Sequence, residues 1–245
     1  MFSLIFGDQV ACDEGGGAPG GPEQAASAAA AADPVSRSRR VETVDGNGTT
    51  ELYGRMGRGR AGKGEKIHQM RIIAGKYGRR KLLSLEGVET RPMLDRMRET
   101  LFNVLQTEVP GVVFADLYAG TGAVGLEALS RGAKEAIFVE QNPKAVRVIE
   151  ANLHAFGASQ DALVRMRTVE EALPDMEADI WFLGPPYPAV EEYGKTLNAL
   201  GEKGVQLAIA QHDRKLDLEE RYGSLERKRL MKLGANALSF YRPAE

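Results

Sequence analysis

Hydrophobic and polar positions alternate between strand-like and helix-like segments from residue 112 onward. Short apolar runs predict strands at residues 112–117, 136–139, 163–166, 179–183 and 205–210. Between them, apolar residues recur at helical spacing and predict helices at residues 123–130, 143–156 and 190–200. This alternation predicts an α/β fold with a mainly parallel sheet and helices on both faces. Residues 227–233 and 238–241 predict an antiparallel C-terminal hairpin.

A basic segment precedes this core. Residues 70–82 predict two short strands around a glycine-containing turn, and Pro92 suits the first turn of the helix that follows. Pro110-Gly111 ends that helix. We therefore expect one domain at residues 70–245, with the hairpin and helix at 70–109 and the α/β core at 110–245.

Composition separates the first 69 of the 245 residues from the rest. This part contains Gly15-Gly16-Gly17 and the alanine run Ala28–Ala32, and it has no sustained apolar periodicity. Such a segment buries too little apolar surface to offset its chain entropy. We expect residues 1–69 to be a disordered, low-complexity extension.

The charge and cysteine content exclude several classes of protein. The formal net charge is −2, and the single cysteine, Cys12, allows neither a disulfide framework nor a cysteine metal site. The three histidines are scattered without ligand spacing, so we expect no metal. No apolar stretch approaches membrane-spanning length, and we expect a cytoplasmic monomer.

Five cations lie close together near residue 70, with no acidic residue until Glu86: Arg71, Lys76, Arg79, Arg80 and Lys81. A run of this kind is commonly a solvated face. Its position immediately ahead of the α/β core favours the other interpretation, a patch that contacts the phosphates of a nucleic acid.

A glycine turn follows the strand predicted at residues 112–117. Gly120 to Gly125 match G-x-G-x-x-G, and Glu140 follows at the distance where an acidic residue would bind a ribose. Alone, the pattern fits a nicotinamide-dependent dehydrogenase or a purely structural turn. Asp116 argues for another ligand, because a carboxylate repels a pyrophosphate and attracts the ammonium group of an amino acid. S-adenosylmethionine has an amino-acid end and a ribose but no phosphate.

A second turn follows the strand predicted at residues 179–183, at Gly184-Pro185-Pro186-Tyr187. Two prolines fix the backbone, so that carbonyl groups point to a fixed place beside an aromatic ring that can stack on a base. Acceptors on the N–H groups of an exocyclic amine would orient its lone pair for methyl transfer. The alternative is a proline turn that only leads into the next helix.

The two motifs, their order and their spacing resemble the RsmD-type methyltransferases, class I enzymes that methylate a guanine N2 amine in 16S ribosomal RNA. The resemblance includes Met70–Lys76, Thr90-Arg91-Pro92, Asp116–Gly122 and Gly125–Ala133. It implies a Rossmann-like fold, S-adenosyl-L-methionine as cofactor, and the small ribosomal subunit or an assembly intermediate as partner. Such proteins usually begin near Met70, so residues 1–69 are expected to be dispensable.

The resemblance also implies roles for individual residues. The cofactor-binding residues would be Asp116, Tyr118, Gly120, Gly122, Glu140 and Glu170. The catalytic turn would comprise Gly184, Pro185, Pro186 and Tyr187. The RNA-binding residues would be Arg71, Lys76, Arg79, Arg80, Lys81 and Arg91.

Two positions depart from the family pattern. Gly184 stands where the family has an Asp or Asn that accepts a hydrogen bond from the target amine. Thr168-Val169 stand where an acidic residue usually meets the adenine amine, and nearby Glu170 is the substitute. Two other interpretations therefore stay open. One is a DNA adenine-N6 methyltransferase, and the other is a catalytically weak protein that binds the cofactor and RNA.

Overall fold

An eight-stranded sheet runs through the described part of the chain, which is residues 70–84, 95–186 and 188–245 of this computed structural model. The strand order is β3-β2-β1-β4-β5-β8-β7-β6. Strands β1 to β5 are parallel, and β8, β7 and β6 continue the sheet in antiparallel fashion. The strands are β1 (Val113–Leu117), β2 (Glu135–Val139), β3 (Ala162–Arg165), β4 (Ile180–Leu183), β5 (Ala208–Asp213), β6 (Arg221–Tyr222), β7 (Leu225–Leu233) and β8 (Asn236–Pro243).

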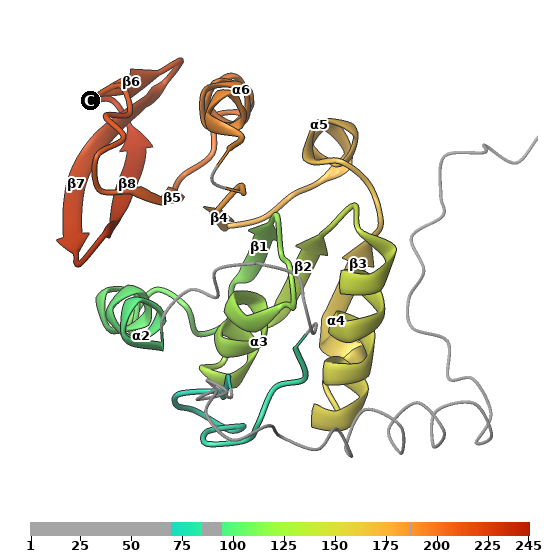
Figure 1. Cartoon of the computed structure of the whole chain (residues 1–245). Helices are drawn as coiled ribbons and strands as arrows, with labels where there is room; N and C mark the ends of the chain where they lie inside the picture. The colour runs from blue at the N-terminus through green and yellow to red at the C-terminus, as the bar shows by residue number, and fades with distance from the viewer. Residues whose placement is uncertain (1–69, 85–94, 187) are drawn as a thin grey trace, which may run out of the picture. The chain divides into compact units, whose positions relative to one another are not determined.

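Helices cover both faces of this sheet (Figure 1). Alternate strand residues point to opposite faces, so Phe114, Phe138 and Phe182 pack with α2, α3 and α4 on one side. Leu117, Val139 and Trp181 pack with α5 and α6 on the other side. The expected α/β class, with a mainly parallel sheet and an antiparallel C-terminal hairpin, is confirmed. The helices are α2 (Asp95–Val104), α3 (Ala123–Ser130), α4 (Pro143–Phe156), α5 (Val169–Ala172) and α6 (Val190–Lys203), with 3₁₀ turns η1 (Ser159–Asp161) and η2 (Leu173–Asp175).

The two helices α3 and α4 have the bounds that the sequence predicts. For α4 both ends carry a local signal. Asn142 caps the first turn by accepting a hydrogen bond from the backbone N–H of Lys144, and Pro143 occupies the first helical position. Gly157 ends the helix in the left-handed conformation, with a φ of 66°. Capping at both ends therefore fixes this helix locally.

Some predicted strand bounds are wrong. The strand predicted at 205–210 is β5, at Ala208–Asp213. Buried Val205 and Leu207 lie ahead of it, whereas polar Gln211 to Asp213 pair with β8. The strand predicted at 163–166 lies one residue earlier, as β3. Helix α5 and strand β6 were not predicted. Both are short, and neither carries a sustained hydrophobic period.

The two arms of the segment at 70–84 pair as an irregular hairpin, with one antiparallel bridge between Arg71 and Lys81 and backbone hydrogen bonds from Ile72 to Arg80, from Arg79 to Ile72 and from Leu82 to Met70. Its backbone also bonds to helices. Ile73 and Ala74 donate to the carboxylate of Glu127, and Lys76 donates to the carbonyl of Ser130. Acceptors on α3 thus hold this hairpin against the helix, and its arms form no regular strands. The expectations for residues 1–69, for the helix start near Pro92, and for Arg91 and Tyr187 lie outside the described residues.

Candidate functional site

The two turns singled out in the sequence lie side by side at the carboxyl edge of the sheet. Strands β1 and β4 are parallel neighbours, and Leu117, the last residue of β1, is in register with Leu183, the last residue of β4. The glycine turn that starts at Tyr118 and the turn that starts at Gly184 therefore leave adjacent strand ends, roughly 5 Å apart. In open α/β sheets, ligands bind at this edge.

Asp116 is buried on the face of β1 that packs against α3. Its Oδ2 atom accepts a hydrogen bond of 2.8 Å from the backbone N–H of Gly125. Burial raises the pKa of Asp116 to about 8, the hydrogen bond from Gly125 opposes that rise, and the nearby Glu140 carboxylate adds to it. A cationic ligand at this carboxylate would reverse the effect of burial and favour the charged form.

Glu140 ties the glycine turn to the end of β2. One carboxylate oxygen accepts from the backbone N–H of Gly120 and the other from the N–H of Asn142, each at 2.8 Å. Gly120 and Gly122 have φ of 56° and 77°, a conformation that glycine adopts without strain. No atom lies within 4 Å of where a Cβ on Gly120 would stand. This open approach beside two carboxylates suits the amino-acid and ribose ends of S-adenosylmethionine.

Tyr118 is anchored to α6. Its hydroxyl lies 3.0 Å from Oε2 of Glu192 and 2.9 Å from Oγ1 of Thr196. Burial raises the pKa of this hydroxyl above its usual value. Tyr118 also has a φ of 62°, which is rare for a residue with a side chain and marks backbone strain. Its hydroxyl is thus held by α6, and its role in cofactor binding stays a prediction.

Glu170 lies in the first turn of α5 and is exposed. It lines a cavity of about 440 Å³ between α5 and α6, to which Leu173, Glu192 and Thr196 also contribute. Thr168, which stands at the departure from the family pattern, caps α5 by accepting a hydrogen bond from the backbone N–H of Glu171. A capping role explains a hydroxyl at position 168. The assignment of Glu170 to the adenine amine stays a prediction.

Gly184 begins the turn after β4. Its φ is not positive, so a residue with a side chain could adopt the same backbone conformation. A Cβ atom on Gly184 would meet a ring carbon of Phe182 at 3.6 Å and Oε1 of Gln211 at 3.8 Å, both ordinary contacts. The carbonyl of Pro186 accepts a hydrogen bond of 2.8 Å from the backbone N–H of Ala189. Pro185 is buried and Pro186 is exposed. The position thus has room for the side chain that the family pattern has there.

Two of the predicted RNA-binding cations between residues 70 and 84 make contacts far from the glycine turn, near the C-terminal end of α4. Lys76 pairs at 3.4 Å with Asp161, directly ahead of β3, and Arg80 packs on Phe156 and donates to the carbonyl of Ala155 near the end of α4. These groups lie toward the amino edge of the sheet, as the teal segment below α3 and α4 shows (Figure 1). Arg71, Arg79 and Lys81 are exposed. Their role in RNA binding stays a prediction.

Two groups of polar residues were not predicted from the sequence to have a structural or functional role. Arg98 and Glu127 are both fully buried, with Nε of Arg98 3.6 Å from the Glu127 carboxylate. Gln211, two residues before the end of β5, presents its side chain beside Gly184. A buried charge inside an amphipathic helix such as α2 gives no local signal. Gln211 is recognisable only once β5 is known to extend to Asp213 and to lie next to β4.

Metal sites and membrane-spanning helices can be assessed in the described part of the chain. Within residues 70–84, 95–186 and 188–245, no group of three or more His, Cys, Asp or Glu side chains could hold a metal ion. None of the helices in those residues combines the length and the apolar character needed to cross a bilayer.

Residues 70–242 match the model of a family described as Conserved hypothetical protein 95. YlbH of Bacillus subtilis, named as a candidate rRNA methyltransferase, is 33% identical over 183 residues, which are 71% of this chain and 98% of that protein. Ribosomal RNA small subunit methyltransferase D of Escherichia coli is 35% identical over 139 residues, 56% of this chain and 69% of its own. The structure of yhhF from Escherichia coli, titled as a candidate methyltransferase, is 29% identical with a TM-score of 0.64, and the match covers 72% of this chain and 99% of that one.

Proposed function

The chain belongs to the family described as Conserved hypothetical protein 95, the RsmD-type methyltransferases, and from this premise we propose that it methylates small-subunit ribosomal RNA. In this proposal the methyl donor is S-adenosyl-L-methionine and the acceptor is the N2 amine of a guanine in 16S ribosomal RNA. The partner is the small ribosomal subunit or one of its assembly intermediates.

One observation carries the proposal: a carboxylate-lined glycine turn and a Gly-Pro-Pro turn leave adjacent ends of β1 and β4. Methyl transfer requires the donor and the acceptor to be held together with their reacting atoms aligned. Two sites at neighbouring strand ends meet that requirement. The names of the relatives favour RNA over the DNA adenine amine as the acceptor.

On the cofactor side, two carboxylates have the principal roles. Asp116 would hold the ammonium group of the amino-acid end, because a buried carboxylate gains most from a cationic partner. Glu140 would accept hydrogen bonds from the ribose hydroxyls, and Gly120 and Gly122 let the backbone approach closely. Bound there, the cofactor would supply an electrophilic sulfonium methyl group.

On the acceptor side, the turn after β4 would hold a guanine extruded from its stack. The carbonyl groups at Gly184 and Pro185 are candidate acceptors for the N–H groups of the amine, and hydrogen bonds to them would orient its lone pair. Oε1 of Gln211 is a further candidate acceptor, because it lies next to the place that the Asp or Asn side chain of the family would occupy at position 184. Tyr187 would stack on the base.

A second candidate function is a cofactor- and RNA-binding protein with little or no transferase activity. The observation in its favour is Gly184, since losing one hydrogen bond to the reacting amine would cost about 1.5–3 kcal/mol in a closed site, roughly ten- to a hundredfold in rate.

The deciding experiment is to map methylated guanines in 16S ribosomal RNA from cells with and without this protein. The purified chain should restore the missing methyl group on undermethylated small subunits when S-adenosylmethionine is added. An Asp116→Ala variant serves as the inactive control. If subunits bind and no methyl group is transferred, the binding function replaces the enzymatic one.

A further inference from the structure

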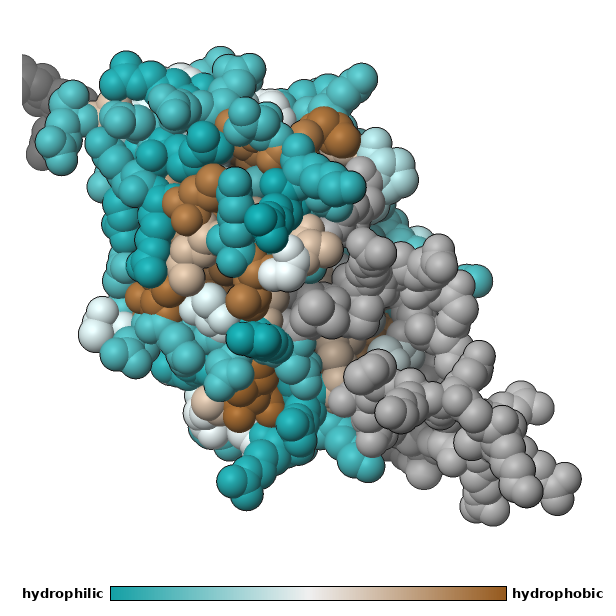
Figure 2. Space-filling model, turned by 60° about the vertical axis from the view of Figure 1, so that its left-hand side comes forward, coloured by the Kyte–Doolittle hydropathy of each residue, from teal (hydrophilic) through white to brown (hydrophobic). Residues whose placement is uncertain are grey.

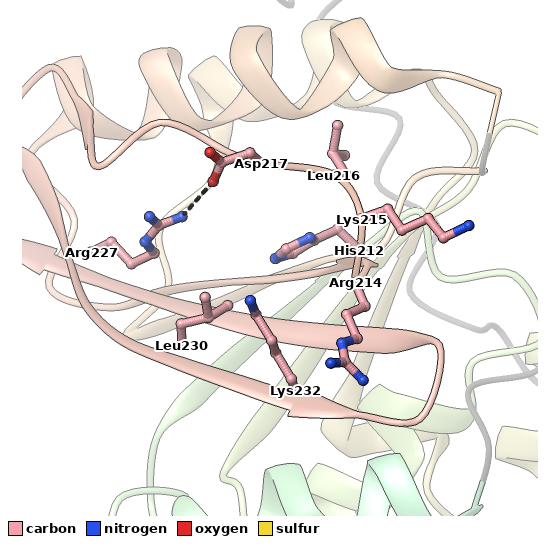
Figure 3. A pocket seen from close by; sticks show the side chains of 8 residues that line it. All are labelled: His212, Arg214, Lys215, Leu216, Asp217, Arg227, Leu230 and Lys232. Atoms are coloured by element: carbon pink, nitrogen blue, oxygen red, sulfur yellow. Dashed lines mark ion pairs between the residues drawn. The ribbon is translucent and has the colours of Figure 1, made fainter.

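A cavity of about 240 Å³ lies between the loop that follows β5 and the strand β7. Figure 3 shows Arg214 and Lys215 on the loop, Arg227, Leu230 and Lys232 on β7, and His212 between them. The ammonium group of Lys232 rises from β7 toward His212, and Arg227 points toward Asp217. We call these residues the β7 pocket. None of these residues has a role in the proposed methyl transfer.

The charge of the β7 pocket is positive. Arg214, Lys215 and Lys232 are exposed, and none of them forms an ion pair with another described residue. Arg227 has only long ion pairs, at 4.0 Å to Asp217 and to Glu220, and both carboxylates are almost fully exposed. The pocket is thus lined by four cations and one carboxylate, Asp217, which pairs with Arg227 alone among them. Such an arrangement attracts an anionic ligand.

His212 forms an uncharged wall of the pocket. One ring nitrogen lies 2.9 Å from the carbonyl oxygen of Asp213 and the other 2.9 Å from the hydroxyl of Ser239. Both nitrogens are therefore engaged within the protein. The anion-binding capacity of the pocket comes from its guanidinium and ammonium groups.

One side of the β7 pocket lies at the carboxyl end of β5, the strand next to β4. Arg214 follows Gln211 by three residues at the carboxyl end of β5, and Gln211 lies beside Gly184. Three residues of extended chain span about 10 Å. An RNA strand whose base enters the site at Gly184 would therefore have phosphates within reach of the pocket a few nucleotides away.

The surface around β7 is hydrophilic. The face that Figure 2 turns forward is covered mainly by polar residues, with small and separate apolar patches. Leu230 is the exposed large apolar residue of the pocket, with 39% of its surface accessible. A polar, polyanionic partner suits this face better than an apolar protein surface.

We propose that the β7 pocket binds the phosphodiester backbone of the substrate RNA, a few nucleotides from the base that is methylated. This inference rests on the proposed function for the identity of the RNA. Phosphate contacts of this kind fix the position and register of the nucleic acid and carry no sequence information. The pocket would thus hold the strand at the catalytic edge, whereas the cations at 70–84 lie toward the opposite edge.

The test compares two double variants that each remove one Arg and one Lys. Arg214→Ala with Lys232→Ala removes the pocket cations, and Arg147→Ala with Lys134→Ala removes exposed cations elsewhere. Affinity for a fragment of 16S ribosomal RNA is measured over a range of salt concentrations. The pocket variant should bind roughly tenfold more weakly, and its salt slope should fall by about 1.4, since each contact with single-stranded RNA contributes about 0.7. The control variant should match the wild type.

Two further measurements make every outcome decisive. Arg214→Lys with Lys232→Arg keeps the charges and should keep RNA affinity, and cofactor affinity should be the same in all variants. Equal RNA binding by the pocket variant and its control would overturn the inference even if the wild type methylates ribosomal RNA. Loss of binding to inorganic phosphate without loss of RNA affinity would identify a small-anion site instead. If the pocket variant loses RNA affinity and the wild type transfers no methyl group, the pocket stands and the proposed function fails.

Discussion

The backbone N–H of Gly125 donates a hydrogen bond of 2.8 Å to Oδ2 of Asp116, which joins the first turn of α3 to the end of β1. A side chain at position 125 would not fit, because a Cβ there would stand 2.3 Å from the ring of Phe138. Glycine at this position therefore allows α3 to lie against Phe138 of β2 while its backbone N–H reaches Asp116. This contact positions Asp116 and leaves its other oxygen for the cofactor in the proposed function.

Cofactor binding at Asp116 should release a proton. Burial holds the pKa of the free carboxyl at about 8, so the group is mainly protonated at pH 7, and an ammonium partner favours the carboxylate. We expect release of close to one proton per cofactor at pH 7, decreasing as pH rises past 8. Calorimetry in buffers of different ionisation enthalpy measures this number. Asp116→Asn should abolish the release.

The same pKa shift makes the ligand-free protein lose stability between about pH 4 and pH 8. Because the folded-state pKa of Asp116 lies above its value in the unfolded chain, the contribution of this group to stability is fully present below about pH 4 and is lost as pH rises to about 8. Asp116→Asn should flatten this part of the pH dependence of the free energy of unfolding. An unaltered curve in the Asn variant would contradict burial as the cause.

Glu140 should control cofactor affinity through both of its carboxylate oxygens. Glu140→Ala removes the acceptors for Gly120 and Asn142, together with the proposed contact to the ribose. We expect cofactor binding to weaken by about 1.5–3 kcal/mol, the range for hydrogen bonds to a charged group. Glu135→Ala, at the other end of the same strand, is the matched control. Equal affinities in the two variants would remove Glu140 from the site.

Glu127 should be decisive for stability. Its carboxylate accepts hydrogen bonds from Ile73, Ala74 and Arg131, and it faces the buried guanidinium of Arg98. Glu127→Ala leaves that charge without a buried counter-charge, so the free energy of unfolding should fall by about 3–5 kcal/mol. Urea denaturation measures the loss, with the exposed Glu99→Ala as control. A loss below about 1 kcal/mol would show that water or Asp95 compensates.

The sequence predicts the parts of this protein that have local causes. Helix α4 has the predicted bounds because its caps are encoded at both ends. Asp116 and Gly184 share one edge because parallel strands end together. The anchoring of Tyr118 by α6, and the pairing of Arg98 with Glu127, join residues far apart in the chain. Such contacts depend on tertiary packing and leave no periodic pattern.

The strand β5 shows how one wrong boundary conceals a site residue. Polar Gln211, His212 and Asp213 resemble a loop in the sequence, yet each pairs with β8. Extending the strand to Asp213 brings Gln211 beside Gly184. The departure at Gly184 and the side chain that lies next to it are thus connected only through the sheet.

The last prediction concerns that pair. Oε1 of Gln211 lies 3.8 Å from the position of a Cβ on Gly184, and the carboxamide of Gln211 makes no hydrogen bond to another described residue. It is therefore available to accept a hydrogen bond from the target amine in place of the family's Asp or Asn. Gln211→Ala should lower the single-turnover methylation rate about tenfold or more, the effect of one lost hydrogen bond at the reacting group. Exposed Gln206→Ala is the matched control.

A double-mutant cycle separates this role from simple packing. Gly184→Asp supplies a charged acceptor at a position where the backbone and the space allow it, so the rate should rise about tenfold. In that background Gln211→Ala should have little effect, because the new side chain takes over the hydrogen bond. Cofactor affinity should be the same in all four proteins. Equal losses from Gln211→Ala in both backgrounds would mean that Gln211 only supports the fold. If Gly184→Asp binds cofactor and RNA and gains no rate, the missing side chain does not limit methyl transfer.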